Sequence, residues 1–322
     1  MKITLITPAN KYSKSGNRTT AVRWGRMLRS QGHSVSIAEI YDGTDCDLMI
    51  AIHAWRSALS IAAYRDKFPL GPLVVALSGT DVNTFLKTEP QKTLHAMRVA
   101  DTLICLHSLI KDELPSDLQC KLHLVYQSAR PLLIPRKPRT QTFGVSVIGH
   151  LREEKDPFRA ALAARLMPAE SRLRVYHFGK AHTDKWARQA KREAANQARY
   201  VWKGEVSAWQ VRRELARTHV MVISSNQEGG ANIVSESIAA GVPIIASSIP
   251  GNVGLLGRNY PGYYPVRDER ALADIFWLAE DDPTFLPKLL HHVDKLRPKF
   301  SPAGEARALA GVIEHATKAP TK

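Results

Sequence analysis

The sequence predicts two doubly wound α/β domains in one chain. Short β-branched or apolar runs alternate with amphipathic stretches in the first half, and the same alternation returns in the second. A proline-rich basic segment, residues 129–143, separates the halves and can form neither a helix nor a central strand. The length of 322 residues also fits two hydrophobic cores better than one. We therefore expect an N-terminal domain over residues 1–135 and a C-terminal domain over residues 143–322, facing each other across a cleft.

Eleven strands are expected from these runs. In the first domain they are KITLITPA, HSVSIAEI, CDLMIAIHA, PLVVALSG, DTLICLH and KLHLVYQS, and in the second GVSVIGH, LRVYHFG, ARYVWKG, HVMVISS and VPIIAS. Helices are expected between them, for example over TTAVRWGRMLRSQG, with Trp24 and Leu28 packing inward and Arg23, Arg26 and Arg29 on the solvated face. The last helix of the chain is a candidate for packing back onto the N-terminal domain.

Composition narrows the class of protein. The 45 Lys+Arg against 30 Asp+Glu give a net charge of +15, spread along the whole chain, which suits anionic small molecules, membrane surfaces and nucleic acid alike. The three cysteines form no C-x-x-C pair, so we expect neither a disulfide framework nor a zinc site. With no cleavage pattern near the N-terminus and no run of 18 apolar residues, we expect a cytoplasmic protein without a membrane span.

One stretch carries a candidate ligand site. SSNQEGGANIVSESIAAGVPIIAS, residues 224–247, reads as a strand end, a loop, a helix stopped by Gly241, and the next strand. Glu228 then lies at the C-terminal end of a strand, where open α/β sheets bind ligands, and Glu236 lies in the following helix. Gly229 and Gly230 give a ligand access to the backbone at a helix N-terminus that favours anions.

Two carboxylates around such a loop suit a nucleotide sugar, because carboxylates accept hydrogen bonds from hydroxyls and free amides bind phosphate. The alternative is an exposed loop glutamate, a solvated helix glutamate and an ordinary turn.

The same stretch resembles the donor-site signature of GT-B glycosyltransferases of the family-four type. VIGHLREEKDP is similar to the G-R-L-x-x-x-K segment that opens the second domain of that family, and YVWKGEVS, which contains Lys203, occupies the place of its base-binding loop. The resemblance implies that Glu228 contacts the sugar and Glu236 the ribose. It also implies donor contacts from several further residues, namely His150, Gly229, Gly230, Ala231 and Asn232.

The sequence departs from the family at two points. His150 stands where the family usually has a phosphate-binding arginine, and Gly230-Ala231 replaces its Phe-Gly. Arg152 can supply the missing charge.

The leaving nucleoside diphosphate needs a metal or fixed cations. The D-x-D at Asp45-Cys46-Asp47 precedes its strand, at the wrong end of the sheet for a bound donor, so we expect metal-free transfer with Lys155 and Arg152 as the clamps. The alternative is that these two cations are exposed to solvent and pair with Glu153 and Glu154. Gly251, Gly254 and Gly257 lack the G-x-G of a dinucleotide site, so no cofactor is expected.

The acceptor is expected on the first domain. The loop and helix start after the first strand place amides, hydroxyls and a guanidinium together, at Gly16, Asn17, Arg18, Thr19 and Thr20. Thr19 and Thr20 could equally be helix caps. Further residues follow strands on the same side, where they could line the pocket, act as bases or serve only as turns: these are His53, 78–81, His107 and 126–128.

This loop, with LSGTD, LVYQSA, GHLREEKDP, EGGANIVSE and IPGNVGLLG, closely resembles the selenosugar synthases of selenoneine biosynthesis. The resemblance implies attack of selenophosphate on a UDP-sugar, with UDP-N-acetylglucosamine as the expected donor, to give a selenosugar, UDP and phosphate. One alternative is a GT-B glycosyltransferase that acts on a hydroxyl of a lipid or polysaccharide. A remote alternative is a basic nucleic-acid-binding protein, for which the sequence offers no recognisable module.

Overall fold

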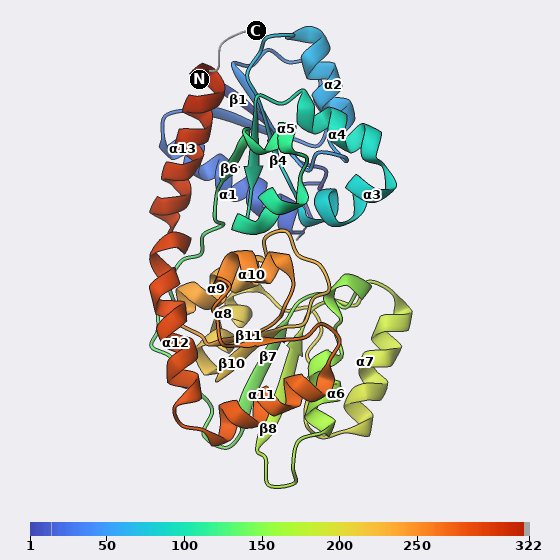
Figure 1. The fold of residues 1–322 in the computed structure, drawn as a ribbon, viewed down its shortest axis with the longest axis vertical. Helices are drawn as coiled ribbons and strands as arrows, with labels where there is room; N and C mark the ends of the chain where they lie inside the picture. The colour runs from blue at the N-terminus through green and yellow to red at the C-terminus, as the bar shows by residue number, and fades with distance from the viewer. Residues whose placement is uncertain (14, 319–322) are drawn as a thin grey trace. The chain divides into compact units, whose positions relative to one another are not determined.

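The computed structural model describes residues 1–13 and 15–318 and divides into two compact units (Figure 1). Unit 1 comprises Met1–Gln127 and the C-terminal segment from Pro302 onward, and unit 2 comprises Ser128–Ser301. Each unit contains a six-stranded sheet in which every pair of neighbouring strands is parallel. The fold class is therefore the doubly wound α/β arrangement that the sequence predicts.

The sheet of unit 1 has the strand order β2-β1-β3-β4-β5-β6. Its strands are β1 (Lys2–Ile6), β2 (Ser34–Ala38), β3 (Leu48–Ile52), β4 (Leu73–Ala76), β5 (Thr102–Cys105) and β6 (Leu122–Leu124). Its helices are α1 (Gly16–Ser30), α2 (Ala58–Lys67), α3 (Leu86–Thr88), α4 (Pro90–Arg98), α5 (Ser116–Gln119) and α13 (Pro302–Lys318). The order along the sheet reverses between β1 and β3, so the ends of these two strands form the switch point of the unit.

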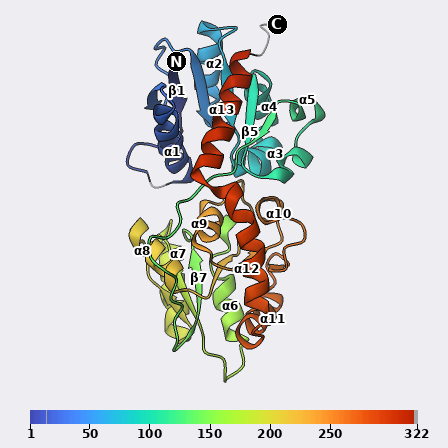
Figure 2. The same cartoon turned by 90° about the vertical axis from the view of Figure 1, so that its left-hand side faces the viewer.

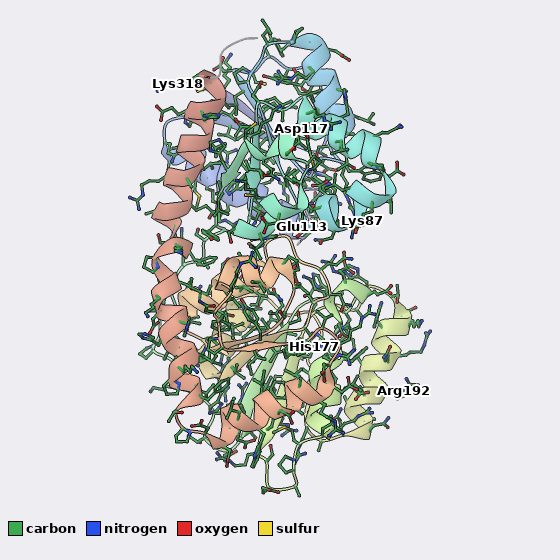
Figure 3. All side chains as sticks on the ribbon, viewed as in Figure 1. Lys87, Glu113, Asp117, His177, Arg192 and Lys318 are labelled. Atoms are coloured by element: carbon green, nitrogen blue, oxygen red, sulfur yellow. The ribbon has the colours of Figure 1, made fainter. Side chains whose placement is uncertain are left out.

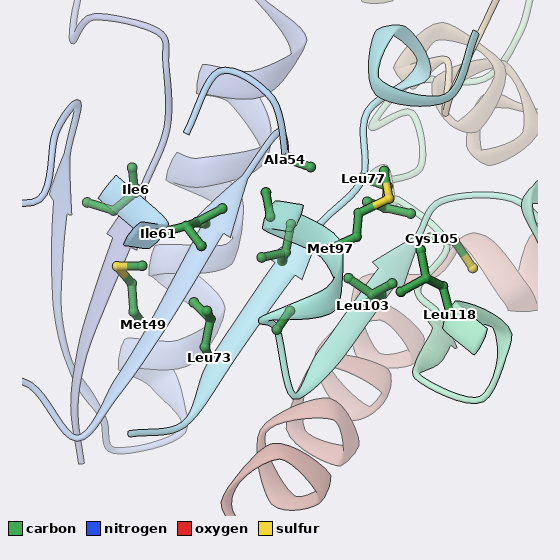
Figure 4. Close-up of a cluster of buried hydrophobic side chains, with 14 of the residues drawn as sticks. Ile6, Met49, Ala54, Ile61, Leu73, Leu77, Met97, Leu103, Cys105 and Leu118 are labelled. Atoms are coloured by element: carbon green, nitrogen blue, oxygen red, sulfur yellow. The ribbon is translucent and has the colours of Figure 1, made fainter. Parts of the chain in front are cut away.

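Both faces of this sheet are covered by apolar side chains. On one face, Met49, Leu73 and Leu103 from successive strands pack against α2 and α4 (Figure 4). On the other face, Ile50 and Val74 pack with Trp24 of α1 and Leu309 of α13. Figure 2 shows α13 running across this second face. Because α13 contributes to the core of unit 1, the chain returns to its first unit after leaving the second.

A buried carboxylate joins α13 to α1. Glu305 is 1% exposed and accepts a hydrogen bond of 2.7 Å from the indole N–H of Trp24. The guanidinium Nε of Arg23 lies 2.9 Å from the same carboxylate. Trp24 and Leu28 are fully buried, as the helical pattern predicts, but the prediction that Arg23 lies on the solvated face is wrong. Its hydrogen bond to Glu305, 282 positions further along the chain, holds this arginine against α13.

The sheet of unit 2 has the strand order β12-β11-β10-β7-β8-β9. Its strands are β7 (Phe143–Ile148), β8 (Leu173–Phe178), β9 (Tyr200–Trp202), β10 (Val220–Ile223), β11 (Ile244–Ser247) and β12 (Tyr263–Tyr264). Its helices are α6 (Arg159–Arg165), α7 (Asp184–Asn196), α8 (Ala208–Arg217), α9 (Asn232–Ala240), α10 (Pro250–Leu256), α11 (Glu269–Asp281) and α12 (Phe285–Leu296). Strand β12 is the one that the sequence patterns do not predict, because two residues are too few to show alternation.

The proline-rich segment before β7 forms no strand or helix but is anchored to unit 2. Arg136 donates to the carbonyl oxygens of Gly241, at 2.6 Å, and Thr218, at 2.7 Å. Arg139 pairs with Glu214 at 2.5 Å. The segment therefore belongs to unit 2, which begins at Ser128, before the boundary expected from composition.

No helix of the described residues combines the length and the apolar character needed to cross a lipid bilayer.

Candidate functional site

A pocket in unit 2 lies at the C-terminal ends of β7 and β10. These strands are neighbours although more than 70 residues separate them, and the strand order reverses between them, which makes them the switch point where doubly wound sheets bind ligands. Loops after both strands line the pocket. The lining includes Gly149, His150, Lys155, Pro157, His177, Ser224, Ser225, Glu228 and Ile233.

Lys155 and Glu228 meet directly in this pocket. The ammonium Nζ of Lys155 contacts the carboxylate of Glu228, which also accepts a hydrogen bond of 2.5 Å from the hydroxyl of Ser225. The Glu228 side chain is only 8% exposed and that of Lys155 is 22% exposed. A buried carboxylate requires such partners, so the pair forms one charge-compensated group. Both residues are predicted from the sequence as donor contacts, but their contact with each other and the contribution of Ser225 are not.

The loop after β10 also fixes the backbone that carries Lys155. This lysine ends a short 3-10 helix, Glu153–Lys155, and Asp156 after it is left-handed with φ 43°. The hydroxyl of Ser224 donates to the carbonyl oxygens of Lys155, at 3.1 Å, and Asp156, at 2.9 Å. The backbone N–H of Asn226 donates to the carbonyl oxygen of Glu154 at 2.8 Å. Ser224 and Asn226 are positioning residues that sequence reasoning missed, although they flank the quoted glutamate loop.

Arg152 has a different environment from Lys155. Its guanidinium lies 3.0 Å from Glu154, and both side chains are about a third exposed. Arg152 thus forms the local ion pair that the alternative interpretation describes, whereas Lys155 pairs with Glu228 instead. The Nε of Arg152 is buried and has no hydrogen-bond partner among the residues that the structure describes.

Two further predicted donor residues lie in the loops after β7 and β9. His150 lines the pocket, and its Nδ1 accepts a hydrogen bond of 3.1 Å from the backbone N–H of Lys180. Burial is the main cause that lowers the pKa of His150 below its ordinary value. The His182 ring, whose centroid lies 5.5 Å from that of His150, is the next. The side chain of Lys203 is exposed, and its backbone N–H donates to the carbonyl oxygen of His177.

The glutamate loop leads into α9 as the sequence predicts. The helix runs from Asn232 to Ala240. Its N-cap is Ala231, and its C-cap is Gly241, which has a left-handed φ of 64°. Within the described ranges no side chain caps its N-terminus, and no acidic residue lies in its first turn. Gly229 is buried, and Glu236 is half-buried in a helix whose neighbours are mostly buried.

Gly251 of α10 packs against the glutamate loop, a role that no sequence pattern indicates. A Cβ there would lie 2.4 Å from the carbonyl oxygen of Glu228, so only glycine lets α10 approach the loop this closely.

The predicted acceptor residues lie at the N-terminus of α1 in unit 1. Ser15 is the N-cap and accepts from the N–H of Arg18 at 3.5 Å, so Thr19 and Thr20 lie inside the helix and are not its caps. Thr20 is buried and accepts a 2.6 Å hydrogen bond from Gln127. Gly16 and Thr19 are exposed and Asn17 is half-buried. Over residues 1–13 and 15–318, the buried Nε of Arg18 has no hydrogen-bond partner.

A histidine and an aspartate form a buried pair at the C-terminal ends of β3 and β4. Nδ1 of His53 lies 2.7 Å from Asp81, which also accepts from the backbone N–H groups of residues 54, 55 and 78. Nε2 of His53 lies 2.9 Å from the hydroxyl of Thr80. His53 has a left-handed φ of 76°, a strained conformation that local contacts must hold.

His107, the other histidine at a strand end, is buried. Its Nδ1 has no hydrogen-bond partner within the described part of the chain, and burial lowers its pKa to about 4.

The D-x-D motif lies before β3, as predicted. Asp45 pairs with Lys67 at 2.7 Å, and Asp47 accepts from the backbone N–H of Lys2 at 2.6 Å. The described residues contain no group of three or more His, Cys, Asp or Glu side chains that could hold a metal ion.

Residues 135–297, just over half of the chain, match the family model of Glycosyl transferases group 1. The chain belongs to this family. No curated protein matches the sequence of this group 1 glycosyltransferase. The matched residues include the glutamate loop, Lys155 and the pocket between them.

Solved structures of low sequence identity match nearly the whole group 1 glycosyltransferase. Anabaena HepE in complex with UDP is 12% identical, with a TM-score of 0.78 over 98% of this chain and 100% of that one. Sucrose-phosphate synthase from Thermosynechococcus elongatus is 15% identical, with a TM-score of 0.82 over 99% and 100%. A glycosyltransferase from Rickettsia africae is 14% identical, with a TM-score of 0.75 over 99% of both chains. The group 1 glycosyltransferase therefore has the GT-B fold that the sequence predicts.

Proposed function

We propose that this glycosyltransferase transfers the sugar of a UDP-sugar, with UDP-N-acetylglucosamine as the expected donor, to selenophosphate. Selenium attacks the anomeric carbon, a C–Se bond forms, and the C–O bond to UDP breaks. Water then cleaves the P–Se bond, so the products are a selenosugar, UDP and phosphate. The observation that carries the donor half is the Lys155–Glu228 pair in a pocket at the switch point of unit 2. The similarity of the fold to HepE in its UDP complex also supports a UDP-sugar donor.

In this proposal the donor lies along the loops after β7, β9 and β10. Glu228 binds the sugar hydroxyls, Glu236 binds the ribose and the loop with Lys203 approaches the base. Lys155, Arg152 and the N-terminus of α9 bind the diphosphate, since fixed cations and helix amides stabilise the charge that develops on a leaving phosphate. The remaining proposed donor contacts are His150, Gly229, Gly230, Ala231 and Asn232.

The acceptor half of the proposal assigns selenophosphate to the start of α1. Arg18 offers a buried guanidinium nitrogen without a partner in the described residues, and the first helical amides belong to Gly16 and Asn17. A small anion offers little apolar area, so charge-assisted hydrogen bonds of this kind must supply most of its binding. All three cysteines of the chain are free thiols, which suits the reducing cytoplasm that we propose as the location.

The mass of the product tests the acceptor assignment. The protein is mixed with UDP-N-acetylglucosamine and selenophosphate, and products are identified by mass spectrometry. We expect a selenosugar together with stoichiometric UDP and phosphate. Transfer to an alcohol with none to selenophosphate would overturn the assignment.

Turnover in the presence of a chelator tests the metal-free mechanism. Excess chelator should leave the rate unchanged, because fixed cations are proposed to bind the diphosphate. Lys155→Ala should lower the rate by about a hundredfold, the usual effect of losing one electrostatic stabiliser. An enzyme that chelator inactivates and magnesium restores would contradict this mechanism.

A hydroxyl acceptor is the second candidate, and one observation favours it. An alcohol must lose its proton during transfer, whereas selenophosphate is already anionic. The His53–Asp81 pair has the geometry of a base held by a carboxylate, with Nε2 directed to the hydroxyl of Thr80. Robust transfer to a lipid or polysaccharide hydroxyl, lost in His53→Gln, would establish this candidate.

A further inference from the structure

The loops after β7 and β8 are paired beyond the end of the sheet. The N–H of Gly149 donates to the carbonyl oxygen of Phe178, and that of Leu151 donates to Lys180, both at 2.9 Å. Gly179 approaches so closely that an added Cβ would lie 1.8 Å from the carbonyl oxygen of Gly149. The backbone on both sides of His150 is therefore fixed by a second loop.

A buried histidine on β8 contacts the same turn. Nε2 of His177 lies 3.1 Å from the carbonyl oxygen of Gly149, and its Nδ1 lies 2.9 Å from the hydroxyl of Tyr200. A carbonyl oxygen can only accept, so Nε2 carries the hydrogen. Burial lowers the pKa of His177 to about 4, which keeps the ring neutral, and its Nδ1 accepts from Tyr200. Figure 3 shows His177 on β8 within unit 2.

The tautomer of His150 follows from the same reasoning. The backbone N–H of Lys180 can only donate, so the Nδ1 that it approaches at 3.1 Å must present a lone pair. A neutral ring with an unprotonated Nδ1 carries its hydrogen on Nε2. His150 lines the pocket, and this N–H is the hydrogen-bond donor that its neutral ring can offer to a ligand there.

We propose that His150 acts as a neutral imidazole whose Nε2–H donates a hydrogen bond to the diphosphate of UDP. The inference rests on the proposed UDP-sugar donor and deepens it. It assigns an uncharged donor to the position where the resembled family usually has a permanently charged arginine. His177 and the backbone N–H of Lys180 are the positioning groups that set the direction of this bond.

The surrounding charges favour a neutral ring. Burial is the main cause that lowers the pKa of His150; the His182 ring, Arg152 and Lys155 act in the same direction, whereas Glu205 acts against them. Protonation would also place a second hydrogen on Nδ1, opposite the N–H of Lys180, and break that bond. The cations Arg152 and Lys155 then supply the charge for the diphosphate, and His150 supplies direction.

Two substitutions separate the nitrogens of this ring. The amide nitrogen of glutamine lies as many bonds from Cα as Nε2, and that of asparagine lies as many as Nδ1. Titration calorimetry with UDP at pH 7.5 should give His150→Gln an affinity within about threefold of the native protein. His150→Asn should bind about tenfold more weakly, the effect of losing one hydrogen bond between a neutral donor and its acceptor. Equal losses in the two variants would overturn the inference.

A spectroscopic measurement tests the protonation state directly. Nitrogen NMR of histidine-labelled protein with UDP, assigned by the signals missing in His150→Gln, should show a hydrogen on Nε2 and none on Nδ1. An imidazolium, or a hydrogen on Nδ1 alone, would overturn the inference. His182→Gln is the control for the neighbouring ring and should leave the His150 signals in the same state. If the native protein binds no UDP at all, the donor assignment itself fails.

Discussion

Glu228 shows how several contacts fix one side chain of the pocket in unit 2. Lys155 and Ser225 bind its carboxylate, and the close approach of Gly251 limits the movement of its backbone. Breaking a buried ion pair leaves an uncompensated charge, so a change at Lys155 also affects Glu228. Glu228 is best tested beside Glu236, the second proposed donor glutamate, which lies in α9.

The two glutamates should have separable effects on UDP. Glu236→Ala should weaken UDP binding by about 2 kcal/mol, because the proposed hydrogen bonds to the ribose involve a charged acceptor. Glu228→Ala should impair sugar transfer, because its proposed partner is the sugar, and should lower UDP affinity less than Glu236→Ala does. Calorimetry with UDP and a transfer assay measure the two effects. Equal loss of UDP affinity in both variants would contradict the division of roles.

His177 should make the stability of the protein depend on pH. Its pKa is lowered to about 4 in the folded protein, so the unfolded chain binds the proton more readily. The resulting stability is complete above about pH 6.5 and falls as the pH decreases from there toward 4, by about 1.4 kcal/mol per pH unit.

The matched variant is His177→Gln, whose amide can still donate to Gly149 but does not titrate. Urea unfolding at pH 7 and pH 5 should show that the native protein loses about 2 kcal/mol more than the variant. Identical losses would show that the imidazole is not held neutral.

The contact between α1 and α13 should contribute strongly to the stability of unit 1. Glu305→Ala removes the partner of Arg23 and of the indole N–H of Trp24, both of which lie at the interface of these helices. We expect a loss of about 3 kcal/mol or more in the free energy of unfolding, the effect of leaving a buried charge without its partner. Urea unfolding measures this loss.

UDP affinity is the control for this variant. It should be unchanged in folded Glu305→Ala, because every proposed donor residue lies in unit 2. Glu305→Gln retains an oxygen that can accept from Trp24 and should be less destabilising. A variant as stable as the native protein would show that α13 is held by its apolar face alone.

Across the whole molecule, the proposed donor and acceptor residues belong to different units of the chain. Arg18→Ala should therefore raise the KM for selenophosphate by at least tenfold, since a charge-assisted hydrogen bond contributes about 1.5 to 3 kcal/mol. UDP affinity should stay close to the native value. Steady-state kinetics with each substrate varied in turn provides the measurement. Normal use of selenophosphate by this variant would contradict the acceptor site.

Much of the fold could be predicted from the sequence because its signals are local. Alternation and apolar runs located eleven strands, and the glycine at position 241 ended α9 where the pattern indicated. The glutamate loop was found by the order of its residues, which a strand, a loop and a helix in succession require. Strand β12, with two residues, carries too little pattern to be found in this way.

The tertiary structure decided which distant residues become partners. No local pattern states that β7 lies beside β10, which is why the contact of Lys155 with Glu228 was not predicted. The pairing of Arg23 with Glu305 and the tautomer of His150 depend in the same way on groups from other elements. Periodicity is set by each segment alone, whereas strand order and the partner of a polar group arise only when segments pack together.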